Sequence, residues 1–115
     1  MTAEEFSELA LSFPEAIQQS HMGHPDFRVR GRIFATLGHP DGSHAMVKLL
    51  PEQQDVLCRS RPEVFTPVPG GWGRRGATYV LLETLDRATA LDALEIAWRN
   101  TAPKSLLRAA RPSTS

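Results

Sequence analysis

The sequence predicts a single α+β domain in which helices flank an antiparallel β-sheet. Amphipathic helical patterns stand near both ends of the chain, and segments that alternate between apolar and polar residues lie between them, separated by turns that contain glycine. At 115 residues, 41% of them hydrophobic, the chain can bury one core and is too short for two ordinary domains. We expect the domain to span residues 1–107 and a flexible polar tail to follow over residues 108–115.

The first predicted element is a helix that ends before Pro14. Thr2 can cap its beginning, and Glu5, three residues later, completes a capping box. Apolar side chains then recur at helical spacing, at Phe6, Leu9, Ala10 and Phe13. The helix ends there because the proline ring cannot be accommodated in a helix interior.

A β-hairpin is predicted over residues 27–37. The side chains of this segment follow the period of two that is typical of half-buried strands. A tight turn is expected at Arg30 and Gly31, in the middle of the segment. The residues expected on the inner face are Val29, Ile33 and Ala35, with the arginines on the solvent face.

The remaining strands are predicted on both sides of this hairpin. Residues 16–22 are mostly polar and indicate an edge strand or an irregular stretch, and a turn at Asp41-Gly42 leads into a strand over residues 45–49. Residues 62–76 are rich in proline and glycine and predict a long loop with one short strand near Phe65. Residues 77–83 are almost continuously apolar, which is typical of a central strand.

Two more helices and a final helical turn are expected. Pro51 begins a short helix, and its inward side chains are expected to be Val56 and Leu57. Asp86 can cap the last long helix. The apolar face of that helix is expected to hold Ala90, Leu91, Leu94, Ala97 and Trp98. A short turn follows Pro103, so helices are expected to cover one face of the sheet.

Charge and cysteine content restrict the function classes. Thirteen basic and thirteen acidic side chains give a formal net charge of zero, so a nucleic-acid site would depend on local segregation of charge. Cys58 is the only cysteine, which excludes an intrachain disulfide. No signal-peptide pattern opens the sequence, and no apolar run approaches the roughly 20 residues that span a bilayer. We therefore expect a cytoplasmic protein with no membrane partner.

Four segments resemble motifs of the MmcQ/YjbR-like family. Residues 27–37 (FRVRGRIFATL) resemble the family hairpin F-x-V-x-x-K-x-F-A, and residues 12–16 resemble its L-P-x-A junction. Residues 46–49 resemble its lysine-bearing strand, and residues 70–76 resemble its Gly-Trp loop. The resemblance spans residues 2–107 and implies a compact layout similar to that of bacterial frataxin (CyaY-like). It also implies DNA binding through a double wing of loops, although Arg32 stands where many members carry lysine.

Two basic segments are the candidate nucleic-acid site. Arg28, Arg30 and Arg32 crowd the predicted hairpin, where their guanidinium groups suit phosphate, or alternatively form a solvated face that discourages edge-to-edge pairing. In the glycine-rich residues 70–76, Trp72 offers a stacking surface beside Arg74 and Arg75. The alternative is that Trp72 folds back into the core. This loop lacks the motifs of phosphate-binding and dinucleotide-binding loops.

Metal binding and catalysis have little support in the sequence. His21, His24, His39 and His44 are the only metal candidates beside Asp26, and no zinc-site spacing is present, so we expect neither a metal nor a cofactor. Cys58 beside Arg59 could favour a thiolate, but a buried thiol is the more common state. No nucleophile elbow is present. We therefore expect no enzymatic activity.

The leading functional hypothesis is a non-enzymatic binding module for nucleic acid. One wing would hold Arg28, Arg30 and Arg32, and the other Trp72, Arg74 and Arg75. Arg30, Arg74 and Arg75 are expected on one side of the molecule, since neither basic segment contains an acid. The alternative is a module that binds another protein or a small anionic ligand, and the sequence does not indicate an oligomeric state.

Overall fold

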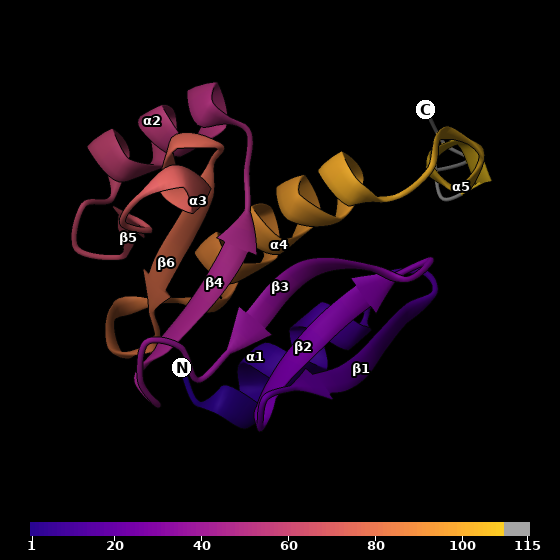
Figure 1. The fold of residues 1–115 in the computed structure, drawn as a ribbon, viewed down its shortest axis with the longest axis horizontal. Helices are drawn as coiled ribbons and strands as arrows, with labels where there is room; N and C mark the ends of the chain where they lie inside the picture. The colour runs from indigo at the N-terminus through magenta and orange to yellow at the C-terminus, as the bar shows by residue number, and fades with distance from the viewer. Residues whose placement is uncertain (110–115) are drawn as a thin grey trace.

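An antiparallel sheet of six strands organises residues 1–109, which are the residues that the computed structural model describes (Figure 1). The strands lie in the order β1-β2-β3-β4-β6-β5. Their bounds are β1 (Ala16–His21), β2 (His24–Val29), β3 (Arg32–Leu37), β4 (His44–Lys48), β5 (Phe65–Pro67) and β6 (Ala77–Leu81). The helices are α1 (Ala3–Leu11), α2 (Pro51–Ser60), α3 (Gly71–Arg74), α4 (Arg87–Thr101) and α5 (Lys104–Ala109), with a 3₁₀ turn at Leu82–Thr84.

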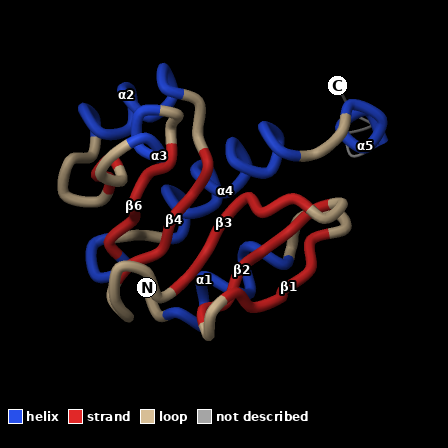
Figure 2. The backbone as a smooth tube through the Cα atoms, viewed as in Figure 1, coloured by secondary structure: helices blue, strands red, loops and turns tan. Residues whose placement is uncertain are grey.

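Helices α1 and α4 cover one face of the sheet, and the opposite face is left open over its central strands (Figure 2). The predicted caps hold both helices: Thr2 accepts a hydrogen bond from the Glu5 amide at 3.1 Å, and Asp86 accepts one from the Thr89 amide at 2.7 Å. Between the helices and the sheet lies a core of buried side chains that includes Phe6, Phe27, Phe34, Leu94 and Trp98. The predicted α+β fold, with helices flanking an antiparallel sheet, is thereby confirmed.

The predicted hairpin is present, but the prediction of its inner face is wrong in one detail. Arg30 and Gly31 both have positive φ, 51° and 81°, which is the conformation of a two-residue hairpin turn that matches the strand twist. Between β2 and β3 the register shifts, so Phe34 and Ala35 both face the core and are fully buried. Ile33 therefore lies on the open face. A β-bulge of this kind breaks the period of two on which the expectation rested.

Two further expectations need correction. Val56 of α2 is 62% exposed, whereas it was expected to face inward. The reason is that α2 lies at the end of the sheet, beside β5, and so has no layer facing its other side (Figure 1). The second half of the predicted loop over residues 62–76 contains the short helix α3, because a hydrogen bond from the Arg74 amide to the Gly70 carbonyl closes a helical turn.

Helix α5 extends into the segment that was expected to be a tail. Arg108 and Ala109 belong to α5, and the remaining residues of the expected tail, 110–115, lie outside the described residues. Over residues 1–109, none of the helices combines the length and the apolar character that a membrane crossing requires.

Candidate functional site

The open face of the sheet contains a hollow whose floor is built by the register of four strands. Asp26, Thr36, Met46 and Tyr79 are successive cross-strand partners on β2, β3, β4 and β6, so they form one row across the sheet. Lys48 and Ala77 form the next row on β4 and β6. Because side chains alternate between faces along a strand, all of these residues point away from α1 and α4.

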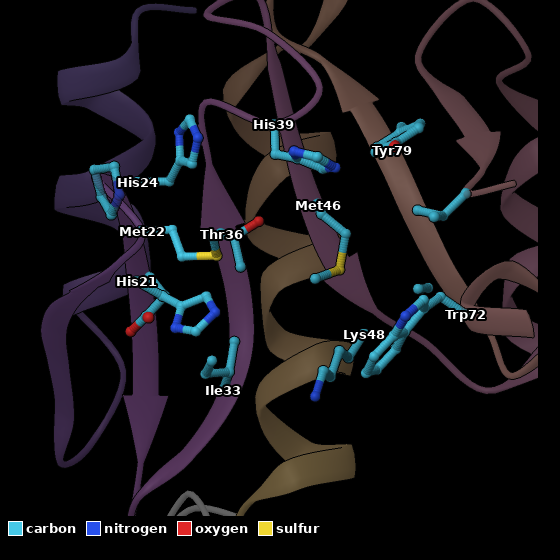
Figure 3. A pocket seen from close by; sticks show the side chains of 14 residues that line it. His21, Met22, His24, Ile33, Thr36, His39, Met46, Lys48, Trp72 and Tyr79 are labelled. Atoms are coloured by element: carbon cyan, nitrogen blue, oxygen red, sulfur yellow. The ribbon is translucent and has the colours of Figure 1, made fainter.

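Loops raise walls on both sides of this floor and enclose a cavity of about 460 Å³. On one side stand Met22, in the turn between β1 and β2, with His24 and His39; on the other stands Trp72 of α3. Figure 3 shows Lys48 and Trp72 close together at one end of the hollow, His24 and His39 toward the other end, and Met46 between them. The hollow is thus lined by rings and thioethers, with a lysine at one end.

Trp72 is held in place by close backbone contacts of α3. A Cβ on Gly73 would lie 1.6 Å from the Val68 carbonyl oxygen, so only glycine fits there. A Cβ on Gly76, whose φ is 112°, would lie 1.9 Å from the Leu49 carbonyl oxygen. The Gln54 side-chain amide, from α2, donates to the carbonyls of Gly73 and Ala77 at 3.0 Å each. These contacts explain why a glycine-rich segment adopts a defined conformation.

Trp72 lies on the surface, flanked by two cations. Its side chain is 62% exposed, so the alternative in which it plugs the core is wrong. The ammonium group of Lys48 and the guanidinium group of Arg75 each lie 6.0 Å from the centroid of its ring. We call Trp72, Lys48 and Arg75 the Trp72 platform. The structure therefore brings Trp72 and Arg75 together as the sequence predicted, and adds Lys48.

Two hairpin arginines are held by carboxylates that the sequence reasoning did not pair with them. Arg28 makes a two-pronged ion pair with Asp26, at 2.8 and 3.0 Å, and hydrogen bonding to that carboxylate raises the pKa of Arg28. Arg30 makes the same kind of pair with Glu15, which raises the pKa of Arg30 and lowers that of Glu15. Asp26 of β2 and Glu15 from outside the hairpin thus bind these two arginines, and the expectation of a wing free of acids does not hold for them.

The other predicted arginines are exposed. Arg32 and Arg28 line a second groove, of about 410 Å³, which also includes Lys48 and so adjoins the hollow. Arg74 is exposed on α3. Figure 1 places the turn that carries Arg30 at the right of the sheet and α3 at the upper left, so these two basic segments lie apart. Lys48 is the residue that connects the groove to the Trp72 platform.

Two of the four histidines lie beside Tyr79, and the histidines do not form a metal cluster in the described part of the chain. The rings of His39 and His44 lie 6.3 and 5.8 Å from that of Tyr79, and His24 lies 6.1 Å from His39. His39 and His44, which flank the turn at Asp41-Gly42, therefore each lie beside the ring of Tyr79. Within residues 1–109, no group of three or more His, Cys, Asp or Glu side chains could hold a metal ion.

Ser43, His44 and Asp41 have the composition of a catalytic triad without its geometry. A triad needs the serine hydroxyl at one imidazole nitrogen and the carboxylate at the other. Here both Ser43 Oγ, at 3.1 Å, and Asp41 Oδ1, at 2.9 Å, contact the same atom, His44 Nδ1. The cluster therefore stabilises the loop between β3 and β4 and lacks the geometry of a triad.

Burial and the charge of Asp55 raise the pKa of the Cys58 thiol, which disfavours a reactive thiolate.

Sequence reasoning missed the floor of the hollow. Met46 and Tyr79 were not singled out, Ile33 was expected to face the core, and Lys48 entered only through the family resemblance. One signal could have found them: residues 77–83 are apolar on both faces, which is typical of a strand covered on both sides. In the described residues one side of β6 faces the core and the other faces the hollow.

Comparisons with known proteins agree with this fold. A family model described as YjbR matches residues 11–100. Among solved structures, protein DR2400 of Deinococcus radiodurans, which carries the domain DUF419, superimposes with a TM-score of 0.69. The sequences are 15% identical, and the superposition covers 84% of this chain and 75% of that one, so this likeness shows the fold alone. No curated protein matches the sequence.

Proposed function

The chain belongs to the YjbR family, and from the geometry of its open sheet face we propose that it is a non-enzymatic binding module for single-stranded nucleic acid. The observation that supports this most is the Trp72 platform: an exposed indole with a cation 6.0 Å from its ring centroid on Lys48 and another on Arg75. A nucleotide offers the complementary pair of groups, since each planar base is linked to a negatively charged phosphate.

The energetics of such a site favour single strands. Stacking of one base on an aromatic side chain contributes about 1–3 kcal/mol, and this needs a base that is free of its own stack. Lys48 continues from the platform into the groove lined by Arg28 and Arg32, so a strand whose base covers Trp72 can place further phosphates along that groove. Because the net charge of the chain is zero, affinity depends on this local row of cations.

Fluorescence anisotropy with labelled oligonucleotides over a salt series tests the proposal. We expect saturable binding of single strands, with the logarithm of the affinity falling linearly with the logarithm of salt concentration. Trp72→Ala should weaken single-strand binding by about tenfold and affect duplex binding less. Lys48→Glu, Arg75→Glu and Arg32→Glu should each reduce the salt slope by about one unit.

Arg87→Glu is the matched control for these charge reversals. Arg87 is an exposed residue at the start of α4, in the helical layer that covers the other face of the sheet. Its reversal should change the salt slope much less than reversal at the platform. If the wild-type protein binds no oligonucleotide even at low salt, or if Arg87→Glu and Arg75→Glu behave alike, the proposed interface is wrong.

A further inference from the structure

We propose that the hollow on the open sheet face is a binding site for a small planar aromatic molecule that carries one negative charge, such as an aryl carboxylate. This site is distinct from nucleic-acid binding, because its ligand would lie inside the hollow, whereas a nucleic acid would cover the platform and the groove outside it. The two sites share Lys48, Trp72 and Ile33.

The shape of the hollow suits a small molecule. Its volume of about 460 Å³ lies within the roughly 300–1,000 Å³ of ordinary ligand pockets. The floor is one row of side chains across the sheet, Asp26, Thr36, Met46 and Tyr79, because each is the cross-strand partner of the next. Met22 and Trp72 stand on opposite sides of the hollow, and a flat ligand would fit between them (Figure 3).

The charge of the hollow indicates an anion. Asp26 is its only lining carboxylate, and Arg28 neutralises it in an ion pair in which the Asp26 side chain is 1% exposed. Lys48 lines the same hollow, and none of the ion pairs found within residues 1–109 includes it. The one unpaired charge among the lining side chains, counted over those described residues, is therefore a cation at the Trp72 end.

The lining side chains favour an aromatic ring. Tyr79, His39 and His24 present ring edges and faces to one another at centroid distances of 6.1–6.3 Å, and Trp72 stands at the other end. Met22 and Met46 add two thioethers, which make favourable contacts with aromatic rings and adapt to irregular shapes. The Met22 side chain is 85% exposed in the free protein, so a ligand would give it a partner. A ring in the slot with its carboxylate toward Lys48 meets each of these groups.

The test uses 2-naphthoate as the probe and the methionine methyl groups as reporters. The chain has three methionines: Met46 on the floor of the hollow, Met22 on its wall, and Met1, whose amino group donates to the Leu82 carbonyl outside it. In spectra of protein labelled with ¹³C at the methionine methyls, saturable shifts are expected at Met46 and Met22 and none at Met1. The neutral isostere 2-naphthamide should bind at least tenfold more weakly, and cyclohexanecarboxylate should also bind more weakly than 2-naphthoate.

Two substitutions separate charge from shape. Lys48→Gln should remove the preference for naphthoate over naphthamide, whereas Lys104→Gln, at the only other lysine, should leave it unchanged. Thr36→Trp should fill the floor and abolish the shifts at Met46 in a protein that circular dichroism shows to be folded. The inference is overturned if naphthoate shifts neither Met46 nor Met22 at millimolar concentration, if Met1 shifts equally, or if naphthamide binds as well as naphthoate. None of these readouts depends on an oligonucleotide.

Discussion

At the scale of single residues, the two tryptophans show how position decides the role of one side chain. Trp98 is 2% exposed in the core, where its indole N–H donates to the Pro14 carbonyl at 3.1 Å. Trp72 is 62% exposed, and the groups near its ring are cations. The sequence placed Trp98 correctly, because it falls on a helical apolar stripe. It left Trp72 open between core and surface, because a glycine-rich segment has no periodicity to orient it.

Truncation of each tryptophan should therefore have opposite consequences. We expect Trp98→Ala to lower the free energy of unfolding by about 3–5 kcal/mol, since it leaves a large cavity in the core. We expect Trp72→Ala to change it by no more than about 0.5 kcal/mol, as for an ordinary surface substitution. Urea denaturation followed by far-ultraviolet circular dichroism measures both. A loss of more than about 2 kcal/mol for Trp72→Ala would show that this residue supports the fold.

The hairpin arginines show that the ion-pair partner of a charged residue cannot be identified from the local sequence alone. Alternation correctly places Arg28 on the face opposite Phe27. It does not show that Asp26, two residues earlier and on the same face as Arg28, forms an ion pair with the Arg28 guanidinium group. The partner of Arg30 is Glu15, fifteen residues away, which the pairing of β1 with β2 brings to the hairpin turn. A count of charges within residues 27–37 therefore overestimates how many arginines are free, because the partners of Arg28 and Arg30 lie before that segment and one of them is brought there by strand pairing.

At the scale of elements, the short helix α3 depends more on Gly73 than on its other glycine, Gly71. A Cβ on Gly73 would overlap the Val68 carbonyl oxygen, 1.6 Å away, whereas a Cβ on Gly71 would make only an ordinary contact with Arg74 at 3.9 Å. We expect Gly73→Ala to cost about 1–3 kcal/mol of stability by overpacking, and to displace Trp72. Gly71→Ala should be neutral or stabilising by up to about 1 kcal/mol, because alanine favours a helix.

Thermal denaturation and the emission of Trp72 measure these two effects. In Gly73→Ala, the emission maximum and the accessibility to acrylamide of Trp72 should change together with the midpoint; in Gly71→Ala, neither should change by much. Equal effects of the two substitutions would mean that the close approach at Gly73 is not what positions α3.

The loop between β3 and β4 owes part of its order to Asp41. The hydroxyl of Ser43, and to a lesser extent the ring of His44, lower the pKa of Asp41 from 3.8 to about 2. A carboxylate whose pKa is lower in the folded state binds fewer protons there, so its stabilising effect is complete above the unfolded pKa and is lost as the pH falls through the folded one. The contribution of Asp41 should therefore disappear between about pH 4 and about pH 2.

Comparison of the wild-type protein with Asp41→Asn isolates this contribution from those of the other carboxylates. The difference between their urea midpoints should be largest at pH 5 and should shrink toward pH 2. Ser43→Ala should reduce the difference in the same window, since Ser43 is the main cause of the lowered pKa. A difference that stays constant over this range would show that Asp41 does not act through its charge.

The element scale also shows which parts of the fold depend on local signals. The caps at Thr2 and Asp86, the turn at Arg30-Gly31 and the helix that begins at Pro51 were predicted because each has its signal within a few residues. The bulge that turns Phe34 inward has no such signal. It arises from packing against the core, where a phenylalanine gains more from burial than the ladder loses from one missing pair.

At the scale of the whole molecule, the two faces of the sheet have different uses. One face is covered by α1 and α4 and holds the core, and helical periodicity was sufficient to predict it. The hollow could not be predicted in the same way, because its walls come from segments at residues 22, 39 and 72 that only the full topology brings together. Their juxtaposition follows from the strand order, in which β4 and β6 lie side by side although 28 residues separate Lys48, the end of β4, from Ala77, the start of β6.

The two proposed ligands would both contact Lys48 and Trp72, and we therefore expect them to compete for binding. An aryl carboxylate in the hollow would neutralise Lys48 and cover one side of the indole, so a single strand bound to the platform would lose both contacts. The apparent dissociation constant of 2-naphthoate should therefore rise with the concentration of a single-stranded oligonucleotide. By linkage, naphthoate should lower the affinity of the protein for the oligonucleotide by the same factor.

Methionine methyl shifts and anisotropy, recorded on the same mixtures, measure the two sides of this competition. In Thr36→Trp, whose hollow is filled, naphthoate should no longer affect oligonucleotide binding, because Trp72, Arg75 and the groove remain as they were. If both ligands saturate the wild-type protein together without mutual effect, Lys48 and Trp72 do not serve both, and the hollow and the platform are separate sites. If one ligand fails to bind at all, the other measurement still stands, because each has its own reporter.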